Sequence, residues 1–454
     1  MNRIYRRIRP SGVLAIVVLT VLALVNPGHA NAQARIDGIE NVTAFSFTAG
    51  AGELSTPDGG SIHFWGYQDL GGNEGVGVPQ YPGPTLILNQ GDSVTISLTS
   101  GLPQCTSMVF PGHTVTASGG DQDGPLTRET CPNGTAVNYT FTATDPGTYT
   151  YYSGTQPELQ IEMGLVGAII VRPAMDIGGD VGYAYDRADT AFDHEVMFLL
   201  TSMDPGIHQL AEQNRFAEID LTQRWPVYWF INGRAAPDDL AAPFVGWLPH
   251  QPYNCTPRMS PGQRLLVRII GGDRDQHPLH LHGNHYKEIA RYGRLLTLAD
   301  GETLAPRKRF TTLSVPGQTV DAIFEWTGEK LGWDIYGSTL DGMPAHDCID
   351  GDGDGFGDVS AGSTYEHEYC ADHDKKFPVV LPETQNLAFG GWWSGSPYMG
   401  GSGALPPGEG GLNPYGGFFF MWHSHAEKEL TNFDIFPGGM LSMMVVEPPG
   451  TPIH

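Results

Sequence analysis

Short runs in which apolar and polar residues alternate recur along the whole chain, separated by glycine, proline, asparagine and aspartate. Examples are residues 85–92, 93–98 and 263–270. A period of two is typical of β-strands with one buried face, whereas no segment sustains the helical period of about 3.6 over four turns. Only residues 204–217 fit a short helix. The pattern predicts an all-β protein.

Two parts of the chain share an opening turn, a strand pair and a glycine-rich return strand. The turns lie at 82–85 and 262–264, and the return strands lie at 164–171 and 438–446. This partial repeat predicts two β-sandwich domains in one chain.

The predicted domains occupy residues 35–175 and 176–454. The second is too long for a bare sandwich, and its residues from about 333 to 414 are rich in Gly, Asp, Trp and Pro with little strand pattern. Such a stretch is expected to be an insertion in a surface loop of the second domain.

Residues 1–34 have the features of a signal peptide. A basic start is followed by an apolar stretch from Val13 to Val25, which is too short to span a membrane, and then by the small-residue site Ala32-Gln-Ala34. We expect cleavage near Arg35 and export to the periplasm, the cell surface or the medium. No later stretch is apolar enough for a membrane span.

The chain has a net charge of −25, which disfavours nucleic acid and anionic lipid as partners and favours metal cations. Its 60 glycines, 35 prolines and 17% charged residues fit a turn-rich β protein.

Five cysteines in an exported chain predict two disulfides and one free thiol. Cys348 and Cys370 bracket a short acidic loop, and Cys105 and Cys131 lie in the same predicted domain. We expect these two pairs and a free Cys255, although spacing alone does not fix the connectivity.

Two clusters of histidines carry the candidate chemistry. Residues two apart in a strand point to the same side, so His280 pairs with His282, and His423 pairs with His425. Brought together across a sandwich or a domain interface, four imidazoles would bind a transition metal. His277 points elsewhere and could serve a second site. The alternative is a set of histidines that hydrogen-bond within a β core.

Residues 277–283 match in full the His-Pro-x-His-Leu-His-Gly motif of multicopper oxidases, the laccase-like family of cupredoxin domains, and 423–425 resemble its His-Cys-His motif. The resemblance extends from about residue 83 to 447. It implies two cupredoxin-like Greek-key β-sandwiches, copper as the cofactor and oxidoreductase activity. Two-domain relatives form trimers, so a homo-oligomer is a possible state.

The resemblance also implies roles for the histidines. His277 matches a blue-copper ligand, and His280 matches a ligand of the second copper type. The remaining three, His282, His423 and His425, match ligands of the coupled copper pair.

The departures from the family pattern affect every copper. Ser424 replaces the blue-copper cysteine, Glu429 stands where the second blue-copper histidine is expected, and Met440 resembles the terminal methionine but lies further downstream. The two His-x-His motifs of the first domain are replaced by other residues, which are Val109, Pro111, Tyr152 and Gly154.

A thiolate makes blue copper a fast electron acceptor, and a serine hydroxyl cannot replace it. Three interpretations remain open. One metal ion, copper or zinc, binds among the four histidines; or His277, Glu429 and Met440 form a weaker second site; or the histidines are retained only as packing residues.

A second metal signal is the acidic loop at 350–358. Carboxylates alternate with glycine in the manner of calcium loops, and the candidate ligands are Asp350, Asp352, Asp354, the Phe356 carbonyl and Asp358. The loop resembles those of thrombospondin type 3 repeats, in which nearby acids complete the cage. Candidates for that role are Glu366, Glu368 and Asp372. The alternative is a solvated acidic turn.

The leading hypothesis is an exported multicopper-oxidase-like protein that binds copper, or another transition metal, but is not a competent four-copper oxidase. One alternative is a calcium-stabilised, non-enzymatic surface or matrix protein. Another is an atypical copper oxidoreductase. The other histidines show no ligand spacing and are expected mostly at the surface; they are His194, His208, His250, His346, His367 and His373.

Overall fold

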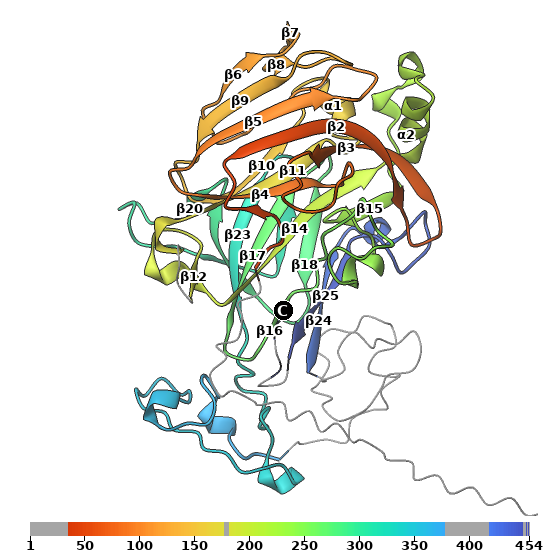
Figure 1. The fold of residues 1–454 in the computed structure, drawn as a ribbon. Coiled ribbons are helices and arrows are strands. Elements are labelled where there is room, and N and C mark those ends of the chain that lie inside the picture. Colours follow the sequence, from red (N-terminus) through yellow and green to blue (C-terminus); the bar gives the residue numbers. More distant parts are fainter. Residues whose placement is uncertain (1–34, 177–180, 377–416, 448–450, 452, 454) are drawn as a thin grey trace, which may run out of the picture.

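The computed structural model describes residues 35–176, 181–376, 417–447, 451 and 453. The predicted signal peptide lies outside these residues, as does the part of the predicted insertion from 377 to 414. The chain is built mainly of strands arranged in two β-sandwiches, so the all-β, cupredoxin-like prediction is confirmed (Figure 1).

The first sandwich faces a four-stranded sheet, β1-β4-β11-β10, against a five-stranded sheet, β3-β2-β5-β9-β6. The strands of the first sheet are β1 (Ile39–Glu40), β4 (Gly83–Asn89), β11 (Val166–Arg172) and β10 (Gly147–Tyr152). Those of the second are β3 (Ser61–Asp69), β2 (Ala44–Ser55), β5 (Ser93–Ser100), β9 (Val137–Thr142) and β6 (Thr116–Gly119). The short hairpin β7 (Gln122–Asp123) and β8 (Arg128–Glu129) lies beside them. Alternation is clear in β5, where Val94, Ile96 and Leu98 are buried.

The second sandwich contains the histidine motifs. Its seven-stranded sheet consists of β15 (Tyr228–Ile231), β14 (His194–Met203), β17 (Arg264–Gly271), β23 (Thr319–Glu325), β19 (Tyr286–Arg291) and β20 (Arg294–Leu295), with β21 (Arg307–Arg309) paired to β19. Its five-stranded sheet consists of β16 (Arg258–Met259), β25 (Leu441–Val446), β24 (Phe418–Ser424), β18 (His277–Leu281) and β22 (Thr311–Ser314). A separate pair, β12 (Gly182–Tyr183) and β13 (Ala191–Phe192), precedes both sheets.

The helix expected at 204–217 is present but ends earlier, as α2 (Pro205–Glu212). Asp204 caps it by accepting a 2.8 Å hydrogen bond from the Gly206 N–H. Its buried residues Ile207 and Ala211 join the core of the first sandwich, although the helix follows β14 of the second. A second helix, α1 (Pro157–Gln160), is one turn long.

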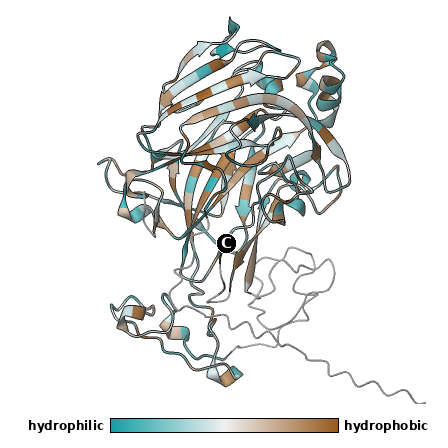
Figure 2. Cartoon of the chain, in the orientation of Figure 1, coloured by the Kyte–Doolittle hydropathy of each residue, from teal (hydrophilic) through white to brown (hydrophobic). Residues whose placement is uncertain are grey.

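An apolar seam joins the two sandwiches. Ile87 and Ile170 of the first sandwich pack with Leu199 and Ile270 of the second in one buried cluster. Figure 2 shows the apolar positions concentrated on the strands of both sandwiches. Arg268, also fully buried, donates a 3.0 Å hydrogen bond to the Glu195 carboxylate beside this seam. The two sandwiches are therefore joined both by buried apolar side chains and by buried polar contacts, such as the ion pair of Arg172 with Glu195.

The cysteine predictions are confirmed. Cys105 is bonded to Cys131, Cys348 is bonded to Cys370, and Cys255 is free and buried. Within the described residues, no helix is long and apolar enough to cross a membrane.

We expect Leu199→Ala to lower the free energy of unfolding by about 2 to 5 kcal/mol, because it opens a cavity in the seam between the sandwiches. Leu298→Ala is the matched control, since Leu298 is 55% exposed and its loss should change stability by less than about 0.5 kcal/mol. Urea titration measures both. Equal effects would contradict the assignment of the seam as a stabilising interface.

Candidate metal centres

The histidine cluster is created by the antiparallel pairing of β18 with β24. In this register His280 lies opposite His423, and Leu279 lies opposite Ser424. Leu279 is fully buried in the sandwich core, so the alternation of the strand turns His280 to the other face of the sheet. The expectation that the histidine pairs meet across a sandwich or a domain interface is wrong, because they lie on neighbouring strands of one sheet.

Three imidazoles converge on this outer face. One ring nitrogen from each of His280, His282 and His423 lies within 4.8 Å of the others, and the Nε2 atoms of His282 and His423 are 2.7 Å apart. The ring of His425 lies 5.0 Å from that of His280, between ring centres, and its residue is exposed. The structure thus brings three predicted ligands together and places the fourth at their solvent side.

Contacts behind the cluster fix the orientation of the rings. His423 Nδ1 donates a 2.6 Å hydrogen bond to the Ser424 carbonyl, which directs the Nε2 lone pair toward His282. His280 Nδ1 lies 2.7 Å from the Thr311 hydroxyl. Burial, followed by the neighbouring imidazoles, lowers the pKa of His280 and His282, and burial lowers that of His423 to about 4. The rings are therefore neutral near pH 7, the form that binds copper or zinc.

His277 lies on the opposite face of the sheet, fully buried. Its Nδ1 is 3.0 Å from a Glu429 oxygen, its Nε2 is 3.0 Å from an Asp273 oxygen, and the Ser424 hydroxyl donates a 2.5 Å hydrogen bond to the same Glu429 oxygen. Burial lowers the pKa of His277, but the two carboxylates outweigh it and raise that pKa to about 10. A doubly protonated ring offers no lone pair to a metal.

Met440 is fully buried in the apolar core, and its carbonyl accepts a 3.0 Å hydrogen bond from the Ser424 N–H. The structure brings His277 and Glu429 together but records no contact between them and the Met440 side chain. The second site predicted from these three residues stays a prediction, and their contacts favour an ion pair.

Segments that would hold the missing His-x-His motifs also lie side by side. Val109 and Tyr152 form an antiparallel bridge with N···O distances of 2.8 and 3.2 Å. A Cβ on Gly154 would lie 2.8 Å from Val109 Cγ1. The Ser107 hydroxyl lies 2.9 Å from that of Thr155, in a region without a histidine ligand. Packing and hydroxyl hydrogen bonds fill this part of the first sandwich.

In the acidic loop, the carboxylates of Asp350, Asp352 and Asp358 converge to within 4.8 Å of one another. Asp354 is not part of the group, and its carboxylate accepts a 2.8 Å hydrogen bond from the Phe356 N–H. Like charges at this separation repel, so the group is suited to a cation.

Two of the three residues expected to complete the calcium cage form contacts elsewhere. Glu366 accepts a 2.7 Å hydrogen bond from the Val359 N–H beside the loop. Asp372 instead accepts from the Gly332 N–H at 2.9 Å, and Glu368 contacts histidines. The prediction is wrong for Asp372 and Glu368.

A four-residue cluster was missed by the sequence reasoning. Asp334, His346, Glu368 and His373 each offer a ligand atom within 4.8 Å of the others. The expectation that the unassigned histidines are at the surface is wrong for His346, whose side chain is 6% exposed, and for the buried His194 and His208. The available signal was that His346 and Glu368 each precede a disulfide cysteine by two residues.

Two cupredoxin-type sandwiches with a histidine cluster on one sheet define a class of copper-protein fold, and comparison with known proteins agrees. A family model described as multicopper oxidase matches residues 73–176. An iron transport multicopper oxidase of Gibberella zeae is 35% identical over 125 residues, which are 27% of this chain and 18% of that protein. A laccase of Oryza sativa subsp. japonica is 26% identical over 255 residues, which are 54% of this chain and 38% of that protein.

Solved structures show the same fold. A blue copper oxidase from Nitrosomonas europaea superposes with a TM-score of 0.51 at 16% identity, covering 89% of this chain and 85% of that one. Another multicopper oxidase gives 0.51 at 15% identity, covering 90% and 87%. The sequence matches span less than half the length of the curated relatives. Residues 73–176 therefore match the multicopper oxidase family, and the chain as a whole shares the fold of these proteins.

The ion pair of His277 predicts a specific pH dependence. Its folded pKa of about 10 lies above the ordinary value of 6.5, so its stabilisation is complete below pH 6.5. Above that, the unfolded chain releases a proton that the folded chain retains, and the free energy of unfolding falls by about 1.4 kcal/mol per pH unit until pH 10. His277→Gln should abolish this slope in urea titrations between pH 6 and 9. Parallel curves for the two proteins would show that His277 is not charged.

Proposed function

We propose that this protein is an exported multicopper-oxidase homologue that binds a single copper ion through His280, His282 and His423, with His425 as a further ligand. The observation that carries the proposal is the convergence of neutral imidazoles, above all the 2.7 Å approach of His282 Nε2 to His423 Nε2. Two lone pairs at that distance repel unless a proton or a metal ion lies between them.

This set of ligands supports one copper ion and not a cluster of three. A four-copper oxidase needs three clustered coppers, and half of their histidines belong to the first domain. Here Val109 and Tyr152 occupy two of the aligned positions, and neither is an ordinary copper ligand.

The residues at the blue-copper position would oppose electron transfer as well. Ser424 supplies a hydroxyl in place of a thiolate, and that hydroxyl is already bonded to Glu429. Glu429 and Asp273 hold His277 between two negative charges. We infer that oxidation of a substrate at such a position, followed by four-electron reduction of oxygen, is not this protein's reaction.

A copper ion bound by the three histidines would supply Lewis-acid or one-electron chemistry. Because His425 is exposed and His280 and His282 are half-buried, the outer side of the cluster is open to solvent. The chain itself would hold the ligand nitrogens in place through the Ser424 carbonyl and the Thr311 hydroxyl.

Export is supported by the leader pattern of residues 1–34 together with two disulfides, which persist in oxidising compartments. The strongly acidic composition would favour the uptake of cations in such a compartment.

Copper loading tests the proposal. After incubation with Cu(II) and dialysis, mass spectrometry should find about one copper per chain, and His282→Ala with His423→Ala should abolish it. His285→Ala is the matched control, because His285 is exposed on the same loop but is not part of the cluster. Three or four coppers per chain, or copper that survives the double substitution, would overturn the proposal.

The substitution Ser424→Cys tests whether the thiolate is the only thing that the blue-copper position lacks. The alternative is that the ion pair of His277 also prevents copper from binding there. We expect the copper-loaded variant to remain without intense blue colour, because both ring nitrogens of His277 face carboxylates and Glu429 is not a histidine. Intense blue colour from this one substitution would mean that His277 is free to bind copper and that the site is dormant, not replaced.

A second candidate function is that of a calcium-stabilised, non-enzymatic surface or matrix protein. The converging carboxylates of Asp350, Asp352 and Asp358 favour it, because oxygen-only clusters suit calcium. Calcium at millimolar concentration outside cells would then be structural.

Calcium should raise the thermal midpoint of the protein, since a ligand at 100 times its Kd stabilises by about 2.7 kcal/mol. Asp350→Asn with Asp358→Asn should abolish the shift measured with and without calcium. Asp347→Asn is the control, because it removes an exposed charge from the same segment outside the cluster. If magnesium gives the same shift, or the double variant keeps it, the loop is not a calcium site.

A further inference from the structure

The described part of the insertion, residues 333–376, forms a small unit that we call the insertion module. It projects below the two sandwiches in Figure 1. Ile335 packs against the core of the second sandwich, but several large apolar side chains are exposed, namely Leu340, Met343, Ile349 and Val359. A unit of this size without its own apolar core needs covalent or metal links. The Cys348–Cys370 disulfide is one such link.

Two imidazoles and two carboxylates meet inside this module. His346 Nε2 lies 3.1 Å from Glu368 Oε1 and 3.3 Å from Asp334 Oδ2. His373 Nδ1 lies 2.7 Å from the same Glu368 oxygen and 3.7 Å from the same Asp334 oxygen. The two rings are nearly perpendicular, with centres 4.7 Å apart. The four ligand atoms therefore surround one position.

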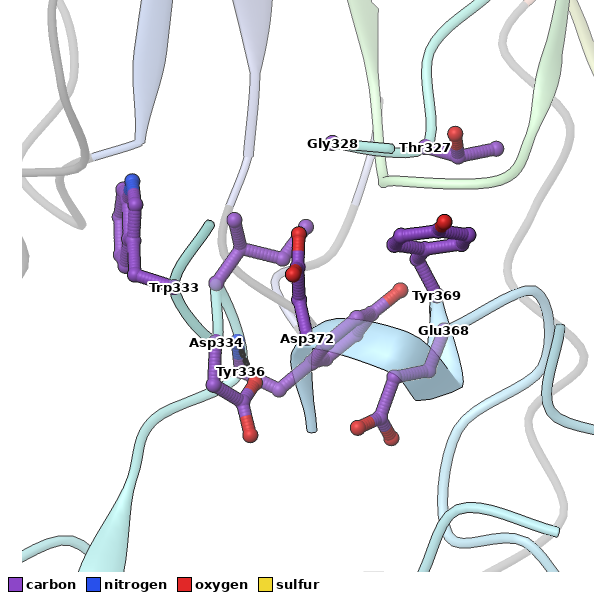
Figure 3. Close-up of a pocket in the computed structure, with 9 residues that line it drawn as sticks. Thr327, Gly328, Trp333, Asp334, Tyr336, Glu368, Tyr369 and Asp372 are labelled. Carbon is purple, nitrogen blue, oxygen red and sulfur yellow. Dashed lines mark hydrogen bonds between the residues drawn. The ribbon is translucent and has the colours of Figure 1, made fainter. Parts of the chain in front are cut away.

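The cluster is buried, and one of its acceptors is unsatisfied. The side chains of Asp334 and Glu368 are 1% and 2% exposed. Glu368 Oε2 accepts no hydrogen bond from any described residue. Figure 3 shows the carboxylates of Asp334 and Glu368 projecting to the same side, whereas that of Asp372 points away. A buried carboxylate oxygen without a partner costs free energy that a bound cation would recover.

Backbone hydrogen bonds fix the Asp334 carboxylate and the main chain at Glu368. Asp334 Oδ1 accepts a 2.9 Å hydrogen bond from the Tyr336 N–H, and its Oδ2 accepts one of 2.7 Å from the Asp374 N–H. The Glu368 carbonyl accepts a 2.8 Å hydrogen bond from the Gly357 N–H. The disulfide joins the segments two residues beyond His346 and Glu368. Such supports are what orient the ligands of metal sites.

We propose that Asp334, His346, Glu368 and His373 form a structural zinc site that holds the insertion module together. Imidazole and carboxylate are both zinc ligands, and four protein ligands close the coordination sphere as structural sites require. Two carboxylates also balance the charge of a divalent ion. This site is separate from the histidine cluster of the second sandwich and does not depend on the copper proposal.

The competing interpretation is a metal-free pair of salt bridges between protonated histidines and the carboxylates. It leaves Glu368 Oε2 without a partner. A divalent ion supplies the missing charge at the centre of the cluster.

The experiment uses the full chain carrying His282→Ala and His423→Ala, so that the histidine cluster cannot contribute metal. After chelation and dialysis against zinc in the presence of excess calcium, mass spectrometry should find about one zinc per chain. Adding His373→Asn should weaken zinc binding at least about tenfold. Glu368→Gln, which preserves volume, should do the same. Absence of zinc from the parent chain would overturn the proposal.

His367→Asn is the matched control, because His367 is exposed in the same loop and its backbone already has φ of 61°, which asparagine tolerates. It should leave zinc content unchanged. His373 is the least buried ligand, with a side chain 28% exposed, so its variant should fold; circular dichroism checks this. Cobalt substitution gives a second readout: a tetrahedral visible spectrum in the parent that His373→Asn abolishes. Zinc retained by both ligand variants would favour the salt-bridge interpretation.

Discussion

The antiparallel pairing of β18 with β24 is the constraint on which the candidate copper chemistry depends. Because successive residues of a strand alternate between faces, one register places His280 beside His423 outside the sandwich and Leu279 beside Ser424 inside it. A shift of one residue would bury the imidazoles in the apolar core. The core formed by Leu279 and Trp422 therefore fixes the geometry of the candidate ligands, because it sets the register that brings the imidazoles together.

The same pairing explains why the inner face has become an ion-pair network. Ser424 and His277 both point inward, and Glu429 bridges them by accepting from the serine and binding the imidazole. Each group satisfies the other, so substituting one alone leaves a buried polar atom without a partner. The burial and contacts of His277, which matches a blue-copper ligand, are thus accounted for by its hydrogen bonds to two carboxylates and require no metal.

The fold was predictable because period-two patterns and turn residues determine strands locally, as at 93–98 and 263–270, which became β5 and β17. That the outer histidines share one face was predictable from their spacing, since alternation requires nothing beyond the strand itself. The cluster around Glu368 was not, because Asp334 lies on an irregular loop and is brought to His373 by the disulfide and by backbone hydrogen bonds. Irregular segments carry no period from which direction can be inferred.

At the positions that align with missing copper ligands, the packing differs from that expected of an oxidase that has lost only its ligands. A scaffold that had only lost ligands would keep cavities or unpaired polar groups at those places. Instead, Val109 and Tyr152 exchange two backbone hydrogen bonds, and a Cβ on Gly154 would collide with Val109. The thiolate position is equally closed by the bond from Ser424 to Glu429. In both regions the side chains contact one another or form hydrogen bonds. The outer histidines, in contrast, direct ring nitrogens toward one another. The two regions thus differ in kind: side chains pack and hydrogen-bond where the family's ligands are absent, and three imidazoles converge where its histidines remain.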